Sequence, residues 1–151
     1  GKRSERRKRI NNRRGIKKRI IMEDSNFDLK DFNKHFTYVS DGRRRDRWHI
    51  MKRKPYRGDC EDYALTVLYN LKGRSLLRMF LSLIKRQSRI RHCKVNGNGH
   101  ATLKYKGKYI DNGYKRWVKK DTMKKNGYKF HKIHYLPYVV LLKLLKGFIL
   151  K

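Results

Sequence analysis

The chain has 151 residues, a length that suits one domain with short extensions, and its formal net charge is +31, from 43 Lys and Arg against 12 Asp and Glu. No apolar run reaches the ~18–20 residues of a transmembrane helix, no secretory signal is seen, and two cysteines are too few for a disulfide framework. This excess of positive charge predicts a polyanionic partner, with nucleic acid as the first candidate and an anionic membrane surface as the second.

The positive charge is unevenly distributed along the chain. Residues 1–20 carry 11 basic residues and one acid, whereas residues 21–62 are nearly balanced and residues 63–151 carry 22 basic residues and two acids. We therefore predict a basic arm over 1–20, a folded domain over 21–118 and a basic extension with an apolar helix over 119–151. The arm is expected to contact nucleic-acid phosphates, with steep salt dependence and little base reading. Its predicted contact residues are Arg3, Arg6, Arg7, Lys8, Arg9, Arg13, Arg14, Lys17, Lys18 and Arg19.

Three helices are predicted in the first half of the domain. Residues 25–36 favour a short amphipathic helix with Ser25 as its N-cap, followed by an irregular stretch. A second helix is expected to begin after Asp59, a good N-cap, and to end at Gly73. Residues 75–87 predict a third helix directly after it. Between 59 and 73 the apolar residues recur at helical spacing, so this helix should have a buried face.

The second half changes to strand periodicity. Residues 88–95, 100–105 and 108–114 predict three antiparallel strands, joined by turns at Asn96–Gly99 and Lys106–Gly107. Residues 115–134 are basic and carry no clear signal, and residues 138–150 predict an apolar amphipathic helix. Strands packed on helices in this order indicate the α+β class.

Cys60 is the residue that most directly suggests chemistry. It lies at a predicted helix N-terminus, where the helix dipole stabilises a thiolate, and a nearby imidazolium would lower the thiol pKa further. His100 and Asp111 fall on neighbouring antiparallel strands, which can present the two side chains side by side. The sequence therefore predicts a cysteine hydrolase in which Cys60 is the nucleophile, His100 the base and Asp111 the group that orients the imidazole.

These motifs resemble the bacterial transglutaminase-like cysteine peptidases, of the papain-like and transglutaminase-like superfamily. GDCEDYAL at 58–65, GHATL at 99–103 and YIDN at 109–112 carry the resemblance, with FTYVSD at 36–41 and DRWHI at 46–50 upstream. It covers roughly residues 27–118. It implies a central helix that carries the cysteine, packed on a small antiparallel sheet, and the roles given above for Cys60, His100 and Asp111, with Asn112 as the alternative acid.

The chain departs from the family in three ways. Family members are usually longer before the cysteine, are far less basic, and often have a proline soon after the tryptophan, whereas here Pro55 comes later. The oxyanion donor is not identified by any motif. The backbone N–H of Cys60 is the default at a helix N-terminus, and Trp48 is a candidate cover for the site.

Several alternatives remain open from the sequence. Asp59, Glu61 and Asp62 match carboxylates that help bind Ca²⁺ in some related proteases, although calcium wants ~6–8 oxygen ligands. Zinc held by both cysteines with neighbouring histidines is a second alternative, and a buried structural thiol is a third. At the level of the whole protein, the competing function is a structural or packaging component of a virion that binds nucleic acid, either without catalysis or in addition to it.

The expected partners follow from these alternatives. They are a protein or peptide substrate, nucleic acid and a large assembly such as a phage virion, which places the protein in a virion interior or a host cytoplasm. The predicted apolar helix over 138–150 is a further expected contact surface, for a membrane or for a neighbouring subunit.

Overall fold

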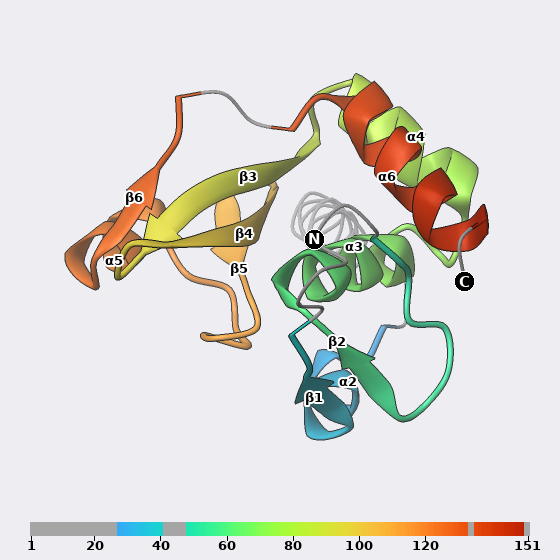
Figure 1. Cartoon of the computed structure of the whole chain (residues 1–151), viewed down its shortest axis with the longest axis horizontal. Helices are drawn as coiled ribbons and strands as arrows, with labels where there is room; N and C mark the ends of the chain where they lie inside the picture. Colours follow the sequence, from blue (N-terminus) through green and yellow to red (C-terminus); the bar gives the residue numbers. More distant parts are fainter. Residues whose placement is uncertain (1–26, 41–47, 133–134, 150–151) are drawn as a thin grey trace, which may run out of the picture.

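Helix α3 (Cys60–Leu71) lies at the centre of the molecule, with a curled antiparallel sheet on one side and two further helices on the other (Figure 1). The computed structural model describes residues 27–40, 48–132 and 135–149, so the arm and its ten predicted phosphate-contacting residues lie outside the described part. The remaining elements are α2 (Leu29–Lys34), β1 (Phe36–Tyr38), β2 (Tyr56–Gly58), α4 (Leu76–Ile84), β3 (Ser88–Val95), β4 (Asn98–Tyr105), β5 (Lys108–Ile110), α5 (Lys120–Lys125), β6 (Tyr128–Phe130) and α6 (Pro137–Ile149). The α+β class predicted from the sequence is confirmed.

Helix α3 begins where the sequence predicts. The Asp59 side chain accepts a hydrogen bond from the Asp62 N–H, and the Asp62 side chain accepts one from the Asp59 N–H, which forms a capping box. Every residue of α3 except Glu61 is buried. The helix ends at Leu71, and Gly73 follows with a φ of +66°, a conformation that glycine adopts without strain.

The sheet has the order β5-β4-β3-β6, with all neighbours antiparallel. The register pairs Ile90 with Leu103 and Leu103 with Ile110, so three fully buried side chains lie in a row in the core cluster that includes α3. Both predicted turns have positive φ at their two central residues, as type I′ hairpin turns require. Strand β5 stops at Ile110 rather than at 114, and β4 begins two residues earlier than expected.

The N-terminal part differs from its prediction. Helix α2 has Asp28 as its N-cap and ends at Lys34, and the expected N-cap Ser25 lies outside the described residues. Phe36 opens strand β1, which pairs in parallel with β2 through Phe36 and Tyr56. The phenyl rings of Phe32 and Phe36 remain 6.1 Å apart. This contact joins helix α2 to strand β1, so the helix predicted over 25–36 ends earlier than expected.

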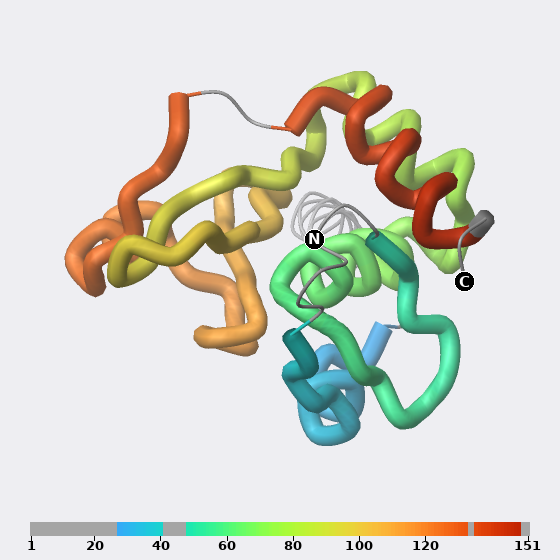
Figure 2. The backbone as a smooth tube through the Cα atoms, viewed as in Figure 1, coloured from blue at the N-terminus to red at the C-terminus, as the bar shows by residue number. Residues whose placement is uncertain are grey.

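Residues 115–134, undefined from the sequence, contain α5 and β6. Strand β6 is the edge strand that pairs with β3, and α5 brings Met123 against Tyr109 and Val118 in a second small hydrophobic cluster. Helix α6 runs beside α4 (Figure 2). It also contacts Trp48, whose backbone N–H donates to the carbonyl of Lys143 at 3.3 Å. Over the described ranges, every helix is too short or too polar to span a membrane.

Candidate active site

Cys60, His100 and Asp111 come from three neighbouring elements. Cys60 is the first residue of α3, His100 lies on β4, and Asp111 directly follows β5. Because Leu103 pairs with Ile110, Asp111 lies across from Thr102 and diagonal to His100, a spacing that longer side chains can bridge. The sheet register therefore explains why two residues 11 positions apart meet.

His100 and Asp111 are directly hydrogen bonded. The His100 Nε2 lies 2.7 Å from Asp111 Oδ2, and the Asp111 side chain is fully buried. Burial opposes ionisation of this carboxyl, but hydrogen bonds from His100, the Tyr114 N–H and Tyr128 outweigh burial and hold the pKa of Asp111 below its usual range. The group bonded to His100 is thus a carboxylate, and it belongs to Asp111 rather than to Asn112.

Tyr128 is a member of this network that sequence reasoning missed. Its hydroxyl donates to Asp111 Oδ2, and its ring stands edge-on to the His100 ring with centroids 5.6 Å apart. Burial first, and then the Asp111 carboxylate, raise the pKa of Tyr128, so the hydroxyl keeps its proton and remains a donor. The Asn126–Gly127 turn signal before it was the only indication of a strand at this place.

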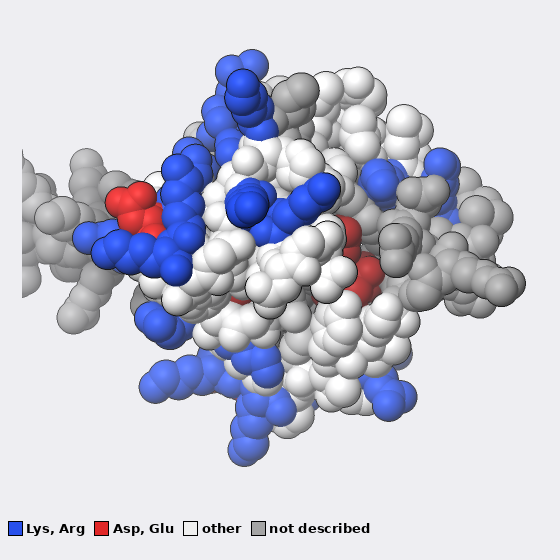
Figure 3. Space-filling model, turned by 60° about the vertical axis from the view of Figure 1, so that its left-hand side comes forward, with Lys and Arg blue, Asp and Glu red and all other residues white. Residues whose placement is uncertain are grey.

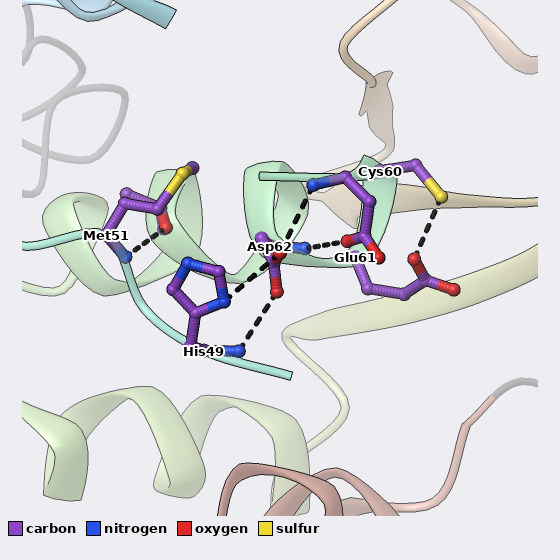
Figure 4. A network of polar contacts seen from close by, with 7 residues as sticks. His49, Met51, Cys60, Glu61 and Asp62 are labelled. Carbon is purple, nitrogen blue, oxygen red and sulfur yellow. Dashed lines mark hydrogen bonds and ion pairs between the residues drawn. The ribbon is translucent and has the colours of Figure 1, made fainter. Parts of the chain in front are cut away.

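The Cys60 thiol is in a different state from the one expected. Its Sγ donates to Glu61 Oε2 at 3.0 Å (Figure 4). Burial raises the pKa of Cys60, and the Glu61 carboxylate raises it further, while the backbone N–H of Ala101 acts in the opposite direction. The lowered pKa of Cys60 expected from the helix dipole and an imidazolium is not met, because the adjacent Glu61 carboxylate and burial act in the opposite direction.

Cys60 lies against strand β4 at Ala101. The amide of Ala101, the residue after His100, is the backbone group that acts on the thiol. In this arrangement the thiol hydrogen bond goes to Glu61 rather than to His100. Since Asp111 occupies His100 Nε2, Nδ1 is the ring nitrogen that remains for a proton from the thiol or a substrate.

The three carboxylates around Cys60 have separate roles. Asp59 and Asp62 form the capping box, and Asp62 also accepts from the His49 N–H at 2.9 Å and lies 3.2 Å from His49 Nδ1. Glu61 alone faces the thiol (Figure 4). The described ranges contain no group of three or more His, Cys, Asp or Glu side chains arranged to hold a metal ion. The calcium and zinc alternatives therefore rest on the sequence alone.

The other residues considered from the sequence occupy structural positions. Both cysteines are free thiols, and Cys93 is fully buried directly across the ladder from His100. Trp48, the candidate cover, is buried with its ring edge-on to Tyr135, 4.8 Å between centroids. Its role as a cover has no support in these contacts.

Comparison with known proteins adds no relative: no family model, curated protein or solved structure matches the chain.

Proposed function

We propose that the protein is a thiol hydrolase of the transglutaminase-like type, which cleaves a peptide or isopeptide bond with Cys60, His100 and Asp111. The observation that carries the proposal is the hydrogen bond of 2.7 Å between His100 Nε2 and Asp111 Oδ2. A buried carboxylate that fixes one imidazole nitrogen leaves the other to exchange protons, which is the arrangement that a base in acyl transfer needs. The position of Cys60 at the start of α3, against Ala101, supports its role as the nucleophile.

The reaction would begin from the neutral thiol. As Sγ attacks the substrate carbonyl carbon, the thiol proton passes to His100 Nδ1, and the imidazolium is stabilised by Asp111. His100 then gives this proton to the leaving amine as the carbon–nitrogen bond breaks, and a thioester with Cys60 remains. Water attacks the thioester and gives one proton to His100, and Cys60 takes a proton back as the acid product leaves.

Glu61 gives this mechanism a specific character. A carboxylate beside the sulfur disfavours a preformed thiolate, because two negative charges would lie close together in a buried place. The proton must therefore leave the thiol during attack, and the side chain of Glu61 must release the S–H as His100 accepts it.

The test compares two single-cysteine substitutions on a mixture of unfolded protein and isopeptide-linked substrates. Cys60→Ala should abolish turnover, whereas Cys93→Ala, which removes the other buried thiol, should retain most of it. Equal activity of Cys60→Ala and the wild-type chain would rule out the proposed nucleophile. Mass spectrometry of a reaction stopped in acid should show the acyl group on the peptide that contains Cys60.

The net charge of +31 favours a second function, binding to the phosphate backbone of nucleic acid in a packaging or virion role. On the face shown in Figure 3, Lys and Arg side chains are spread widely and carboxylates reach the surface in few places. A titration of duplex DNA at several salt concentrations tests it. A steep negative slope of log affinity against log salt is expected, and a flat slope would argue against backbone contact.

A further inference from the structure

Helices α4 and α6 lie side by side at one end of the molecule (Figures 1 and 2). Both helices expose large apolar side chains. Leu77 is 70% exposed and Phe148 is 78% exposed, the highest values among the large apolar residues that the structure describes. We name the whole set the α4–α6 apolar face. Its members are Leu76, Leu77, Leu81, Ile84, Tyr138, Leu141, Leu142, Leu145 and Phe148.

This face is additional to the sides by which the two helices pack on the core. Helix α4 buries Met79 and Leu83, and α6 buries Val140 and Gly147, where an added Cβ would collide with the Trp48 carbonyl. On α6 the exposed residues follow a spacing of three and four, which forms one continuous stripe. A row of large apolar side chains exposed along a helix is a candidate binding surface, because folded monomers rarely expose large contiguous apolar patches.

Positive charge borders the apolar face, and negative charge is absent from both helices. Neither α4 nor α6 contains an Asp or Glu, while Arg78, Lys85 and Lys146 are exposed. A cavity of about 340 Å³ joins the two kinds of surface, because it is lined by Leu81 of the face together with basic and polar residues. These are Lys72, Arg78, Ser82, Lys85 and Gln87.

A larger cavity of about 560 Å³ continues from this one and extends the basic region. The two cavities share Lys72 and Gln87, and the larger cavity adds Arg86, Arg89, Lys104 and Lys106. No carboxylate lines either cavity. The edge of the apolar face is thus suited to anionic groups such as phosphates.

The charge distribution decides among the occupants that an apolar face can have. A second copy of a chain with net charge +31 would be repelled electrostatically. A nucleic acid would bind the cations through its phosphates, but it would leave the row of leucines without an apolar partner. An anionic bilayer supplies both an apolar region for the leucines and phosphates for the surrounding cations. Helices of 9 and 13 residues are too short to cross it, so they would lie in the plane of its surface.

We infer that the α4–α6 apolar face binds the surface of an anionic lipid bilayer, with its apolar side chains in the headgroup region and lipid phosphates at Arg78 and Lys85. The inference is independent of the proposed hydrolase activity, because none of these residues belongs to the Cys60 site. It assigns both helices to the contact, whereas the sequence pointed to residues 138–150 alone.

The test measures co-sedimentation of the full chain with vesicles of phosphatidylcholine and phosphatidylglycerol, three parts to one. In the quadruple variant Leu77→Gln, Ile84→Gln, Leu142→Gln and Phe148→Gln, binding should fall by at least about tenfold, because the loss of buried apolar area removes most of the insertion energy. All four side chains are more than half exposed, so the fold should persist, which thermal unfolding checks. The net charge does not change.

Two control variants separate insertion from simple charge attraction. Tyr38→Gln with Val39→Gln removes exposed apolar side chains from the other end of the molecule and should bind as the wild type does. Arg78→Gln with Lys85→Gln should weaken binding to the anionic vesicles. If the quadruple variant binds these vesicles as tightly as the wild type, the arm or another basic surface makes the contact and the inference is wrong.

A depth measurement gives an independent result. In Phe148→Trp, brominated lipids should quench more tryptophan fluorescence than in the wild-type chain, whose tryptophans are Trp48 and Trp117. No added quenching would contradict insertion. If the quadruple variant instead loses duplex DNA binding, or abolishes a dimer, while vesicle binding is kept, the face serves nucleic acid or a second copy and the inference is overturned.

Discussion

At the scale of single residues, the state of Cys60 is controlled by the one α3 side chain that is not buried. Glu61 Oε2 accepts a hydrogen bond from the Cys60 thiol, 3.0 Å from Sγ, and after burial the Glu61 carboxylate is the main cause of the raised pKa of Cys60. Asp59 acts in the same direction, whereas the Ala101 amide opposes it. The site is therefore held in its protonated form at rest, and reactivity depends on moving one proton away from a carboxylate.

We predict that Glu61→Gln makes Cys60 more reactive. The amide keeps the size of the side chain and an oxygen that can accept the S–H, but it removes the negative charge, so the pKa of Cys60 should fall. Because the thiolate fraction below the pKa changes tenfold for each pKa unit, alkylation by iodoacetamide at neutral pH should accelerate by about tenfold. Peptide mass spectrometry at timed intervals measures this rate for each cysteine separately.

Cys93 is the internal control for this prediction. It is also fully buried, and burial raises its pKa to about 12, yet its hydrogen-bonding surroundings do not include Glu61. Its alkylation should be equally slow in both proteins. A parallel acceleration at Cys93 would mean that the substitution loosens the fold, and no acceleration at Cys60 would mean that Glu61 does not control the thiol.

Asp111→Asn should destabilise the protein at neutral pH, and by less at pH 3, where ionisation of Asp111 contributes less to stability. The folded pKa of Asp111 is lowered from about 3.9 in the unfolded chain, so its ionisation stabilises the fold above that value, and the effect is lost as pH falls through the folded pKa. The loss at pH 7 should be on the order of 2 kcal/mol, the contribution expected for hydrogen bonds to a charged group.

Urea unfolding at pH 7 and pH 3 measures this difference. Asp121→Asn, at an exposed position in the first turn of α5, controls for the change in formal charge. A destabilisation by Asp111→Asn of equal size at both pH values would show that lost packing, and not ionisation, is responsible.

The residues of the site were predictable to different degrees, for physical reasons. Cys60, His100 and Asp111 could be found because each lies beside a strong local signal, a helix cap or a hairpin turn, and the register between two turns is fixed. Tyr128 could not be predicted, because it bonds Asp111 from β6, which forms the edge of the sheet opposite to β5. The role of Glu61 depends on the direction of one side chain, which no sequence pattern specifies.

At the scale of elements, predictability followed length and local turn chemistry. Strands β3 and β4 have eight residues each and a turn between them, so alternation and turn residues agreed. Strands β1 and β2 have three residues each and pair in parallel across a long connection, which leaves no periodic signal. Yet the pairing of β1 with β2 fixes the position of Gly58, the last residue of β2, and therefore the start of α3 two residues later.

Gly58→Ala should destabilise the junction between β2 and α3. An added Cβ would lie 2.7 Å from the Asp62 Cβ and 3.0 Å from the Met51 Sδ, and the capping carboxylate would have to move. Overpacking of this kind costs about 1–3 kcal/mol, which would lower the melting temperature by several degrees in a chain of this length. Differential scanning calorimetry measures the change.

Gly99→Ala is the matched control for Gly58→Ala. The nearest atom to its added Cβ is His92 Nε2 at 3.5 Å, an ordinary contact, and its backbone is not in the left-handed region. Its melting temperature should change little. If the two variants melt alike, the close approach at Asp62 does not limit stability.

At the scale of the whole molecule, the two strongly charged groups of residues have opposite roles. Among the described residues, the buried carboxylates are Asp59, Asp62 and Asp111, which cap α3 or bond His100, whereas Asp28 and Asp121 are exposed. The many cations remain on the surface, and the folded state must hold them close together. Self-repulsion is therefore the main electrostatic cost of folding for this chain, and it should respond to salt.

We predict that salt stabilises the fold. Between 0.01 M and 0.1 M ionic strength the screening length falls from about 30 Å to about 10 Å, so repulsion between distant cations is largely removed. Salt also weakens exposed ion pairs, but among the described residues the Lys–carboxylate pair is Lys54 with Asp31, at 2.8 Å on an exposed surface, and such pairs contribute little. The melting temperature should therefore rise with sodium chloride. A fall would mean that attractive pairs outweigh repulsion.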